Sequence, residues 1–202
     1  MALDVNVLKA ALERWADGIG RAAPELNERD GRLGDGDLGA TLLKCAENVR
    51  ASVPDMQGDI GDAFKRCALA CSKASGSSFG TLLTVAFFVA AKKTEGRASI
   101  AWTEVTDLLD AALTAMSQRG GATLGDKTVL DTLDAARAAS AGIDDPRVLF
   151  EAVSAAVEST IDAFRNKPNR IGRARMFAER SIGIDDPGMI AFQRMLASLR
   201  AA

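Results

Sequence analysis

The sequence predicts an all-α protein in which eight helices run up and down as antiparallel neighbours. Apolar residues recur at helical spacing along most of the chain. One such helical face is formed by Val105, Leu108, Leu109, Ala112, Leu113 and Met116. No run of alternating β-branched residues indicates a sheet. Because the connections between the helical segments are short, consecutive helices are expected to lie antiparallel.

The helix boundaries follow from caps and from the apolar pattern. A helical pattern begins at Leu38, directly after a glycine-rich stretch. Asp126 is expected to cap a helix that begins at Lys127. Asp145 followed by Pro146 is typical of a cap and the first helical position. The expected helices are residues 4–20, 38–52, 59–73, 78–94, 102–118, 127–141, 146–166 and 187–200.

Four glycine-rich connections are expected to lie at the same end of this assembly. Each of them joins an odd-numbered helix to the next even-numbered helix. Alternate connections of an up-and-down arrangement fall at one end. The four connections are residues 31–39, 75–80, 120–125 and 171–188. A composite site built from all four is therefore expected at that end.

Length and charge narrow the class of protein. The 202 residues suit a single domain, residues 1–202, with a sizeable core. The net charge is −2 and the basic residues are scattered, so no nucleic-acid partner is expected. The longest apolar stretch, around residues 82–91, is too short to span a bilayer, and the N-terminus lacks a signal-peptide pattern. We therefore expect a cytoplasmic protein without membrane contact.

The residue types present limit the chemistry. The chain contains no histidine and no tyrosine, which excludes histidine-based proton transfer, a phosphohistidine on this chain and histidine metal ligands. Three cysteines, Cys45, Cys67 and Cys71, do not form a disulfide framework. Cys67 and Cys71 are one helical turn apart and could share a metal, but buried core positions in a reducing compartment are the expected role.

The most informative segment is a run of aspartates and glycines before the second helix. Asp30, Asp35 and Asp37 lie within eight residues, and Gly36 separates the last two. Glycine can adopt positive φ and turn both flanking carboxylates to one side. Clustered carboxylates repel one another unless they bind a cation, and their hard oxygens suit Mg²⁺ or Ca²⁺. The free N–H groups of the helix start at Leu38 would face an anion beside the metal. The pattern indicates a metal–nucleotide site, whereas a solvated glycine-rich turn is the simpler alternative.

The aspartates belong to a series of sequence blocks spread along the chain. The first block consists of the three aspartates and the preceding Leu26-Asn27. The later blocks are Ser75-Gly76, Phe79-Gly80-Thr81, Arg119-Gly120, Gly125-Asp126-Lys127-Thr128, Gly172-Arg173-Ala174, Glu179-Arg180-Ser181-Ile182-Gly183 and Asp186-Pro187-Gly188. In this order the blocks resemble the nucleotide-binding L subunit of dihydroxyacetone kinase, the DhaL family, and the resemblance covers nearly the whole chain.

The resemblance implies a barrel of eight antiparallel helices with the nucleotide at one end. It implies that Asp30, Asp35 and Asp37 hold two Mg²⁺ against the phosphates of ADP or ATP, and that Arg173 contacts these phosphates. These four residues are the implied catalytic set. The residues implied to contact the nucleotide are Leu38, Gly39, Ala40, Thr41, Ala74, Ser75, Gly76, Gly120, Val129, Arg173, Asp186, Pro187 and Gly188.

Simpler structural roles exist for some of these positions. Thr41 could be a helix-surface residue and Val129 a core residue. Lys127 could be a surface charge, and Arg180 could pair with a neighbouring acid. Residues 186–188 form a common turn sequence before a helix.

The resemblance also implies partners. The acceptor, a ketose or polyol, would be held by a separate K subunit, and a phosphotransferase-system protein could rephosphorylate bound ADP. A homodimer is left open. The alternatives are a nucleotide-binding regulatory module and a kinase subunit for another short sugar. The chain departs from the family at Leu38 and Ile184, where histidine is frequent, and at Lys73 and Arg175.

Overall fold

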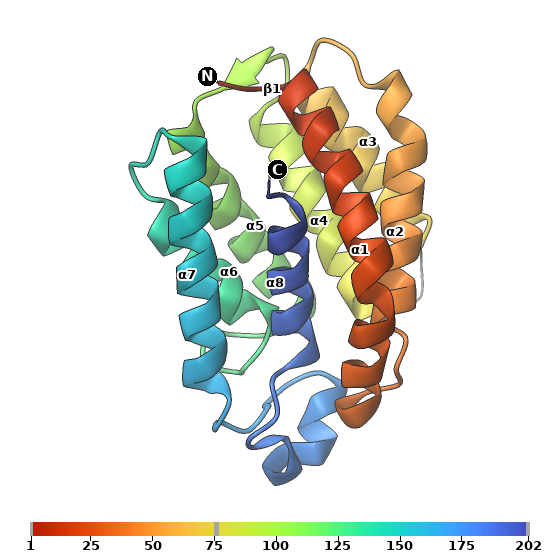
Figure 1. The fold of residues 1–202 in the computed structure, drawn as a ribbon, viewed down its shortest axis with the longest axis vertical. Coiled ribbons are helices and arrows are strands. Elements are labelled where there is room, and N and C mark those ends of the chain that lie inside the picture. Colours follow the sequence, from red (N-terminus) through yellow and green to blue (C-terminus); the bar gives the residue numbers. More distant parts are fainter. Residues whose placement is uncertain (1, 75–76, 201–202) are drawn as a thin grey trace.

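The computed structural model describes residues 2–74 and 77–200, and most of them form helices along the long axis of the molecule (Figure 1). The α-helices are α1 (Val5–Leu33), α2 (Leu38–Ser52), α3 (Ile60–Ser72), α4 (Ser78–Lys93), α5 (Val105–Gly120), α6 (Val129–Ser140), α7 (Pro146–Phe164) and α8 (Pro187–Ser198). Shorter 3₁₀ segments are Val53–Asp55, Trp102–Glu104 and Arg173–Ser181. The predicted all-α class is confirmed.

A small antiparallel strand pair lies at the end of the molecule where the chain begins (Figure 1). Strand β1 (Leu3–Asp4) pairs with β2 (Ser99–Ile100), and Leu3 lies opposite Ile100. Both of these apolar side chains are buried, so the pair covers the adjacent end of the core. A two-residue strand is too short to give the alternating pattern by which a sheet is recognised in a sequence.

Each helix packs against its neighbours in the sequence, and α8 returns to pack against α1, α6 and α7. The main core is formed by apolar side chains from α1 to α4 and α6 to α8, against which half-buried residues of α5 pack. A smaller cluster lies mainly between α5 and α6 and includes Met116, Val129 and Leu130. The three cysteines are buried and unpaired, as expected for core residues. No helix in the described part of the chain combines the length and apolar character that a membrane span requires.

Helix α1 is longer than the sequence indicated. It was expected to end near residue 20, but it continues to Leu33 with Pro24 in its interior. The buried residues Ile19, Leu26 and Leu33 keep the same apolar stripe on the core side beyond this proline. Burying that stripe against α2 and α8 outweighs the local cost of a proline inside a helix. Asp30 consequently lies in the last turn of α1 rather than in a connection.

The start of α6 also differs from the expectation. The helix begins at Val129, and the Thr128 side chain accepts a hydrogen bond from Leu130 N. Asp131 completes a reciprocal cap by accepting from Thr128 N at 2.8 Å. Asp126 instead accepts from the backbone and hydroxyl of Thr123. The expected Asp126 cap is therefore wrong.

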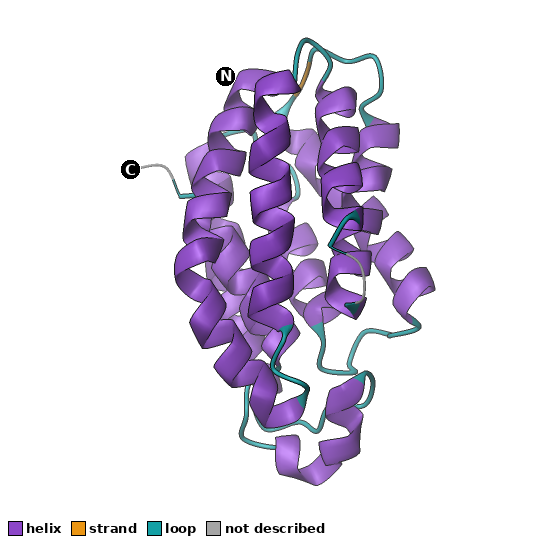
Figure 2. Ribbon diagram, turned by 90° about the vertical axis from the view of Figure 1, so that its right-hand side faces the viewer, coloured by secondary structure: helices purple, strands orange, loops and turns teal. Residues whose placement is uncertain are grey.

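The described parts of the four glycine-rich connections, residues 31–39, 77–80, 120–125 and 171–188, lie at the end of the molecule opposite the strand pair. In Figures 1 and 2 the 3₁₀ segment Arg173–Ser181 projects beyond the helix ends there. The C-terminal end of α1 and the first turns of α2, α4, α6 and α8 face the same region. This end therefore brings together residues from distant parts of the chain.

Candidate functional site

Asp30, Asp35 and Asp37 converge at the end of α1. Each contributes one carboxylate oxygen to a group in which these atoms lie within 4.8 Å of one another. The turn forms because Gly36 adopts φ +78° and the Asp30 carboxylate accepts hydrogen bonds from the backbone N–H groups of Gly36 (2.8 Å) and Asp37 (3.1 Å). Gly34 leaves room for that carboxylate, since a Cβ atom there would lie 2.6 Å from Asp30 Oδ1.

The residues of this cluster fit a divalent cation with oxygen ligands. Asp30 is half-buried, whereas Asp35 and Asp37 are exposed, so the free oxygens can be reached from the pocket. Arg173 forms an ion pair with Asp35, which places a guanidinium beside the carboxylates. Carboxylate-only ligation at an open position is typical of Mg²⁺ that also binds phosphate.

The first turn of α2 adjoins the carboxylates. Its first intrahelical bond runs from Thr41 N to Asp37 O at 2.9 Å, so the N–H groups before Thr41 are not used by the helix. One of them, Ala40 N, donates to Asn27 Oδ1 at 3.0 Å. The Asp37 side chain makes no capping hydrogen bond. The N–H groups of Leu38 and Gly39 are therefore suited to an anion at the positive end of the helix dipole.

A pocket of about 450 Å³ opens beside this helix start. Its volume falls within the range of small-molecule and cofactor sites, roughly 300–1,000 Å³. The lining combines carboxylates, arginines, hydroxyls and apolar side chains. The lining residues are Asp30, Leu33, Asp35, Asp37, Leu38, Ser77, Ser78, Phe79, Thr81, Leu82, Met116, Arg119, Gly120, Ala122, Thr128, Val129, Leu130, Ile171, Gly172, Arg173, Ala174, Asp186, Pro187 and Gly188.

Most of the residues singled out in the sequence line this one pocket. They are Asp30, Asp35, Asp37, Leu38, Gly120, Val129, Arg173, Asp186, Pro187 and Gly188. Gly39, Ala40, Thr41 and Ala74 are not among the lining residues. Thr41 and Ala74 lie close to Gly80 at the start of α4, where a Cβ atom would lie 3.3 Å from Thr41 Cγ2 and 3.5 Å from Ala74 O. Ser75 and Gly76 lie outside the described residues.

Sequence reasoning missed the apolar part of the pocket. Leu33, Leu82, Met116, Ala122 and Ile171 line it, yet their positions in the sequence resemble those of ordinary core residues. Only their proximity to the glycine-rich connections could have indicated a pocket. A ligand with an apolar planar part and an anionic part would match both halves of this lining.

Asp186 is the most buried carboxyl of the pocket. It caps α8 by accepting from Met189 N at 2.9 Å, and its other oxygen accepts from Asn169 Nδ2 at 2.7 Å. Burial raises the pKa of Asp186 to about 6, although these hydrogen bonds favour the charged form. The predicted turn at residues 186–188 thus also serves as the cap of α8.

Lys127 is a buried residue and not a surface charge. Its side chain is 0% exposed and its backbone has φ +62°. The ammonium group donates to the carbonyl oxygens of Arg165, Lys167 and Ser181. Burial lowers the pKa of Lys127 from its usual value. The expectation of a surface lysine is therefore wrong. It arose because a lysine in a glycine-rich block gives no sign in the sequence that backbone carbonyls will surround it.

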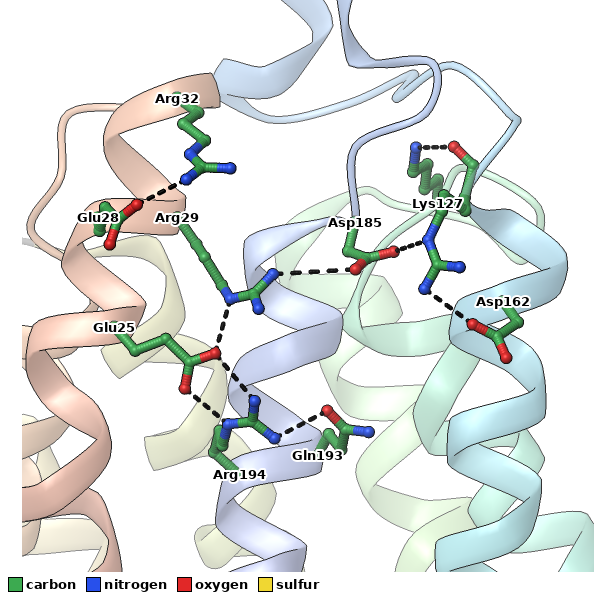
Figure 3. Close-up of polar contacts among 10 residues, drawn as sticks. Glu25, Glu28, Arg29, Arg32, Lys127, Asp162, Asp185, Gln193 and Arg194 are labelled. Carbon is green, nitrogen blue, oxygen red and sulfur yellow. Dashed lines mark hydrogen bonds and ion pairs between the residues drawn. The ribbon is translucent and has the colours of Figure 1, made fainter.

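A chain of ion pairs runs from α1 to the end of α7 and includes Arg194 of α8 (Figure 3). Glu25 of α1 binds both Arg29 and Arg194 of α8, and the hydrogen bond from Arg194 is the largest factor that lowers the pKa of Glu25 to about 2. Asp185 lies between Arg29 (3.8 Å) and Arg165 (2.8 Å). Asp185, the residue before Asp186, is thereby tied to Arg29 of α1 and to Arg165 at the end of α7.

Comparison with known proteins gives a consistent result. Residues 32–201 match the DAK2 domain family. The chain is 29% identical over its full length to the PEP-dependent dihydroxyacetone kinase, ADP-binding subunit DhaL, of Escherichia coli, of which it covers 99%. It is 32% identical to the PTS-dependent dihydroxyacetone kinase, ADP-binding subunit DhaL, of Lactococcus lactis over 81% of this chain and 79% of that protein.

Longer proteins contain a similar segment. Human triokinase/FMN cyclase is 31% identical over 93% of this chain, which covers 33% of that protein. The crystal structure of the dihydroxyacetone kinase from C. freundii in complex with AMP-PNP and Mg²⁺ superposes with a TM-score of 0.76 over 98% of this chain and 34% of that chain. At 22% identity this likeness establishes the shared fold.

Proposed function

The chain belongs to the DAK2 domain family, and we propose that it is the ADP/ATP-binding subunit of a dihydroxyacetone-type kinase. The observation that carries this proposal is the convergence of Asp30, Asp35, Asp37 and Arg173 on one pocket at the helix ends. Three negative groups beside a helix start and an arginine match the needs of a metal-bound polyphosphate. The names of the DhaL relatives, which are ADP-binding subunits, support the same ligand.

Each part of the pocket has a role in this proposal. Asp30, Asp35 and Asp37 would hold Mg²⁺, with enough oxygens for two ions, and Mg²⁺ when bound neutralises charge on the transferred phosphoryl group. The N–H groups of Leu38 and Gly39 and the guanidinium of Arg173 would bind phosphate oxygens. Val129, Gly120 and the turn Asp186–Gly188 line the part of the pocket suited to the base and ribose.

The acceptor would come from a second protein component. The chain has no histidine to serve as a base or to anchor a carbonyl compound, and three of the four aspartates that line the pocket are assigned to the metal. A K subunit docked over the pocket would bring the acceptor hydroxyl in line with the terminal phosphate. Relatives named for dihydroxyacetone and for 3,4-dihydroxy-2-butanone support a short ketose as the acceptor class.

The proposal is tested in two steps with the purified chain. Calorimetry should give saturable binding of ADP or ATP in Mg²⁺ and a marked loss of affinity in EDTA. A coupled assay should detect phosphorylation of short ketoses only when a K subunit is added. Equal nucleotide affinity with and without Mg²⁺ would contradict the metal assignment. Rapid turnover by the chain alone would contradict the division between two subunits.

The phosphoryl donor is tested by the state of the nucleotide. Two DhaL relatives are named as PEP- or PTS-dependent, which supports retention of ADP and its rephosphorylation in place. ADP that co-purifies and resists dialysis is the result expected from that route. Free exchange with ATP during turnover is the result expected from an ordinary kinase. Nucleotide binding without transfer by any partner would favour a regulatory module.

A further inference from the structure

Lys127 makes an unusual set of contacts for a buried lysine. All three donors of its ammonium group are used, by the carbonyl oxygens of Arg165 (3.0 Å), Lys167 (2.8 Å) and Ser181 (2.9 Å). Each acceptor is a backbone carbonyl. Among the described residues, no carboxylate oxygen forms an ion pair with the Lys127 ammonium group. A cation buried in this way is costly unless every donor is satisfied.

The three carbonyls belong to the two ends of a single excursion of the chain. Residues 165–186, which we call the C-terminal clasp, leave α7, extend beyond the helix ends and return to α8 (Figures 1 and 2). Arg165 and Lys167 lie where the clasp departs, and Ser181 lies where it returns. Lys127, which lies outside the clasp, therefore joins the backbone segment that leaves α7 to the backbone segment that returns to α8.

Further contacts join the two ends of the clasp, which together form its base. Gly183 N donates to Arg165 O at 2.9 Å, and Arg165 Nε donates to Asp185 at 2.8 Å. Asn169 Nδ2 donates to both Lys127 O (2.8 Å) and Asp186 Oδ2 (2.7 Å). The side chain and the carbonyl of Lys127 are thus both engaged with the clasp.

The tip of the clasp, the 3₁₀ segment Arg173–Ser181, reaches the pocket, whereas Lys127 does not line it. Arg173 lies at the start of the tip and pairs with Asp35, and Asp186 at the end of the clasp lines the pocket beside Val129. The exposed tip makes few buried contacts of its own, with Ala174 and Ser181 its buried residues. Its position is consequently set by the base that Lys127 closes together with its contacts to the end of α1.

We propose that Lys127 is a positioning residue, which closes the base of the C-terminal clasp and thereby holds Arg173 at the phosphate end of the nucleotide pocket. The proposal rests on the proposed nucleotide-binding function. Lysine suits the task because its three donors diverge and can bind three carbonyls at once. An apolar side chain of similar length would remove one hydrogen bond from each of the three carbonyls, of which Arg165 O and Ser181 O would keep those from Gly183 N and Ile184 N.

The test compares Lys127→Met with Arg173→Ala and with the double variant. Lys127→Met should weaken Mg·ADP binding by at least about 10-fold, the scale of one lost charged contact. If Lys127 acts through Arg173, then Arg173→Ala should weaken binding strongly in the wild-type background and by less than about 3-fold in the Lys127→Met background. Lys65→Met, which removes an exposed lysine of α3, is the matched control and should leave the affinity unchanged.

A second measurement follows the clasp without nucleotide. Trypsin should cleave after the exposed residues Arg173, Arg175 and Arg180 at least about 10-fold faster in Lys127→Met, while sites in the helices stay protected. If Lys127→Met does not fold, Lys127→Gln takes its place in both measurements, since its amide is polar but cannot make all three of the ammonium contacts.

The outcomes separate the two proposals. Equal loss of affinity on Arg173→Ala in both backgrounds, or unchanged cleavage of the tip, would overturn the positioning role. A wild-type chain that binds no Mg·ADP would overturn the proposed function instead, and the cleavage of the tip would still report on the clasp.

Discussion

Gly39 in the first turn of α2 lies directly against the backbone of Ala23 in α1. A Cβ atom on residue 39 would lie only 2.0 Å from the Ala23 carbonyl oxygen and 2.8 Å from Asn27 Oδ1. This contact sets how closely the start of α2 approaches α1. It also places Leu38 and Asp37 beside Asp30 on the last turn of α1. Gly39 is thus required by helix packing whatever it contributes to nucleotide binding.

We therefore expect Gly39→Ala to destabilise the protein by about 1–3 kcal/mol, the usual cost of overpacking. The matched control is Gly20→Ala, because Gly20 lies on the exposed side of the same helix as Ala23 and a Cβ atom there meets nothing within 4 Å. That control should stabilise by roughly 0.5–1 kcal/mol through helix propensity alone. Urea unfolding followed by circular dichroism measures both. Equal stability of the two variants would contradict the close approach.

Regular helix packing was the predictable part of the fold. Helices α2 to α8 begin and end within three residues of the expected bounds, because their apolar faces repeat with the helical period. The predicted first helix ended too early, since Pro24 and the glycines before it are local signals for a helix end. The stripe that carries α1 to Leu33 is stabilised by contacts with α2 and α8, and a local pattern contains no information on such contacts.

The candidate site was predictable where glycine and aspartate recur at fixed spacing. Asp30, Asp35 and Asp37 could be singled out because their residue type and spacing suit a metal, whereas Arg173 was singled out through the resemblance to the DhaL family. The apolar lining, with Leu82 and Met116, could not be separated from the core by residue type. Lys127 was misjudged because its partners are backbone carbonyls, which every sequence possesses.

Asp186 should make stability fall as the pH rises from about 4 to about 6. Its pKa is about 6 in the folded protein, raised mainly by burial, against about 3.9 in an unfolded chain. The folded state therefore binds more protons than the unfolded state in this window, and raising the pH removes that advantage. The difference between the folded and the unfolded pKa of Asp186 corresponds to about 3 kcal/mol of unfolding free energy. Asp186→Asn should lack this dependence.

The measurement is urea unfolding of wild type and Asp186→Asn at closely spaced pH values from about 3.5 to about 7. The difference between the two proteins isolates the contribution of Asp186. Glu25 acts in the opposite sense and at lower pH, because its lowered pKa of about 2 gives stability that is lost as the pH falls below about 4. A constant difference between the two proteins over the whole range would show that Asp186 keeps an ordinary pKa.

Mg·ADP should stabilise the fold. The pocket is formed by segments that are distant in the chain, from Asp30 to Gly188, so a ligand that bridges them binds only the native state. At about 100 times its dissociation constant it should add about 2.7 kcal/mol to the free energy of unfolding. Thermal melts with Mg·ADP, with ADP in EDTA and with Mg²⁺ alone separate the contributions. A melting temperature that none of these ligands changes would count against a composite site.

Asp37→Asn should weaken Mg²⁺-dependent nucleotide binding by about 10-fold or more, which corresponds to roughly 1.5–3 kcal/mol for a lost charged contact. Asp37 is the most direct choice among the three aspartates. Asp30 also accepts the two backbone hydrogen bonds that form the turn, and Asp35 pairs with Arg173. The Asp37 carboxylate is exposed and makes no capping bond. Asp37→Asn should therefore change the metal site while the turn keeps its structure.

The control for Asp37→Asn is Asp144→Asn, which removes the same charge from an exposed connection that does not line the pocket. Calorimetry in Mg²⁺ and in EDTA should show a large difference between wild type and Asp37→Asn in Mg²⁺ only. In EDTA the loss of a negative charge beside the phosphates should leave the affinity equal or slightly increased, because like-charge repulsion is reduced. The same loss of affinity in both conditions would mean that Asp37 acts on the fold of the turn and not through a bound cation.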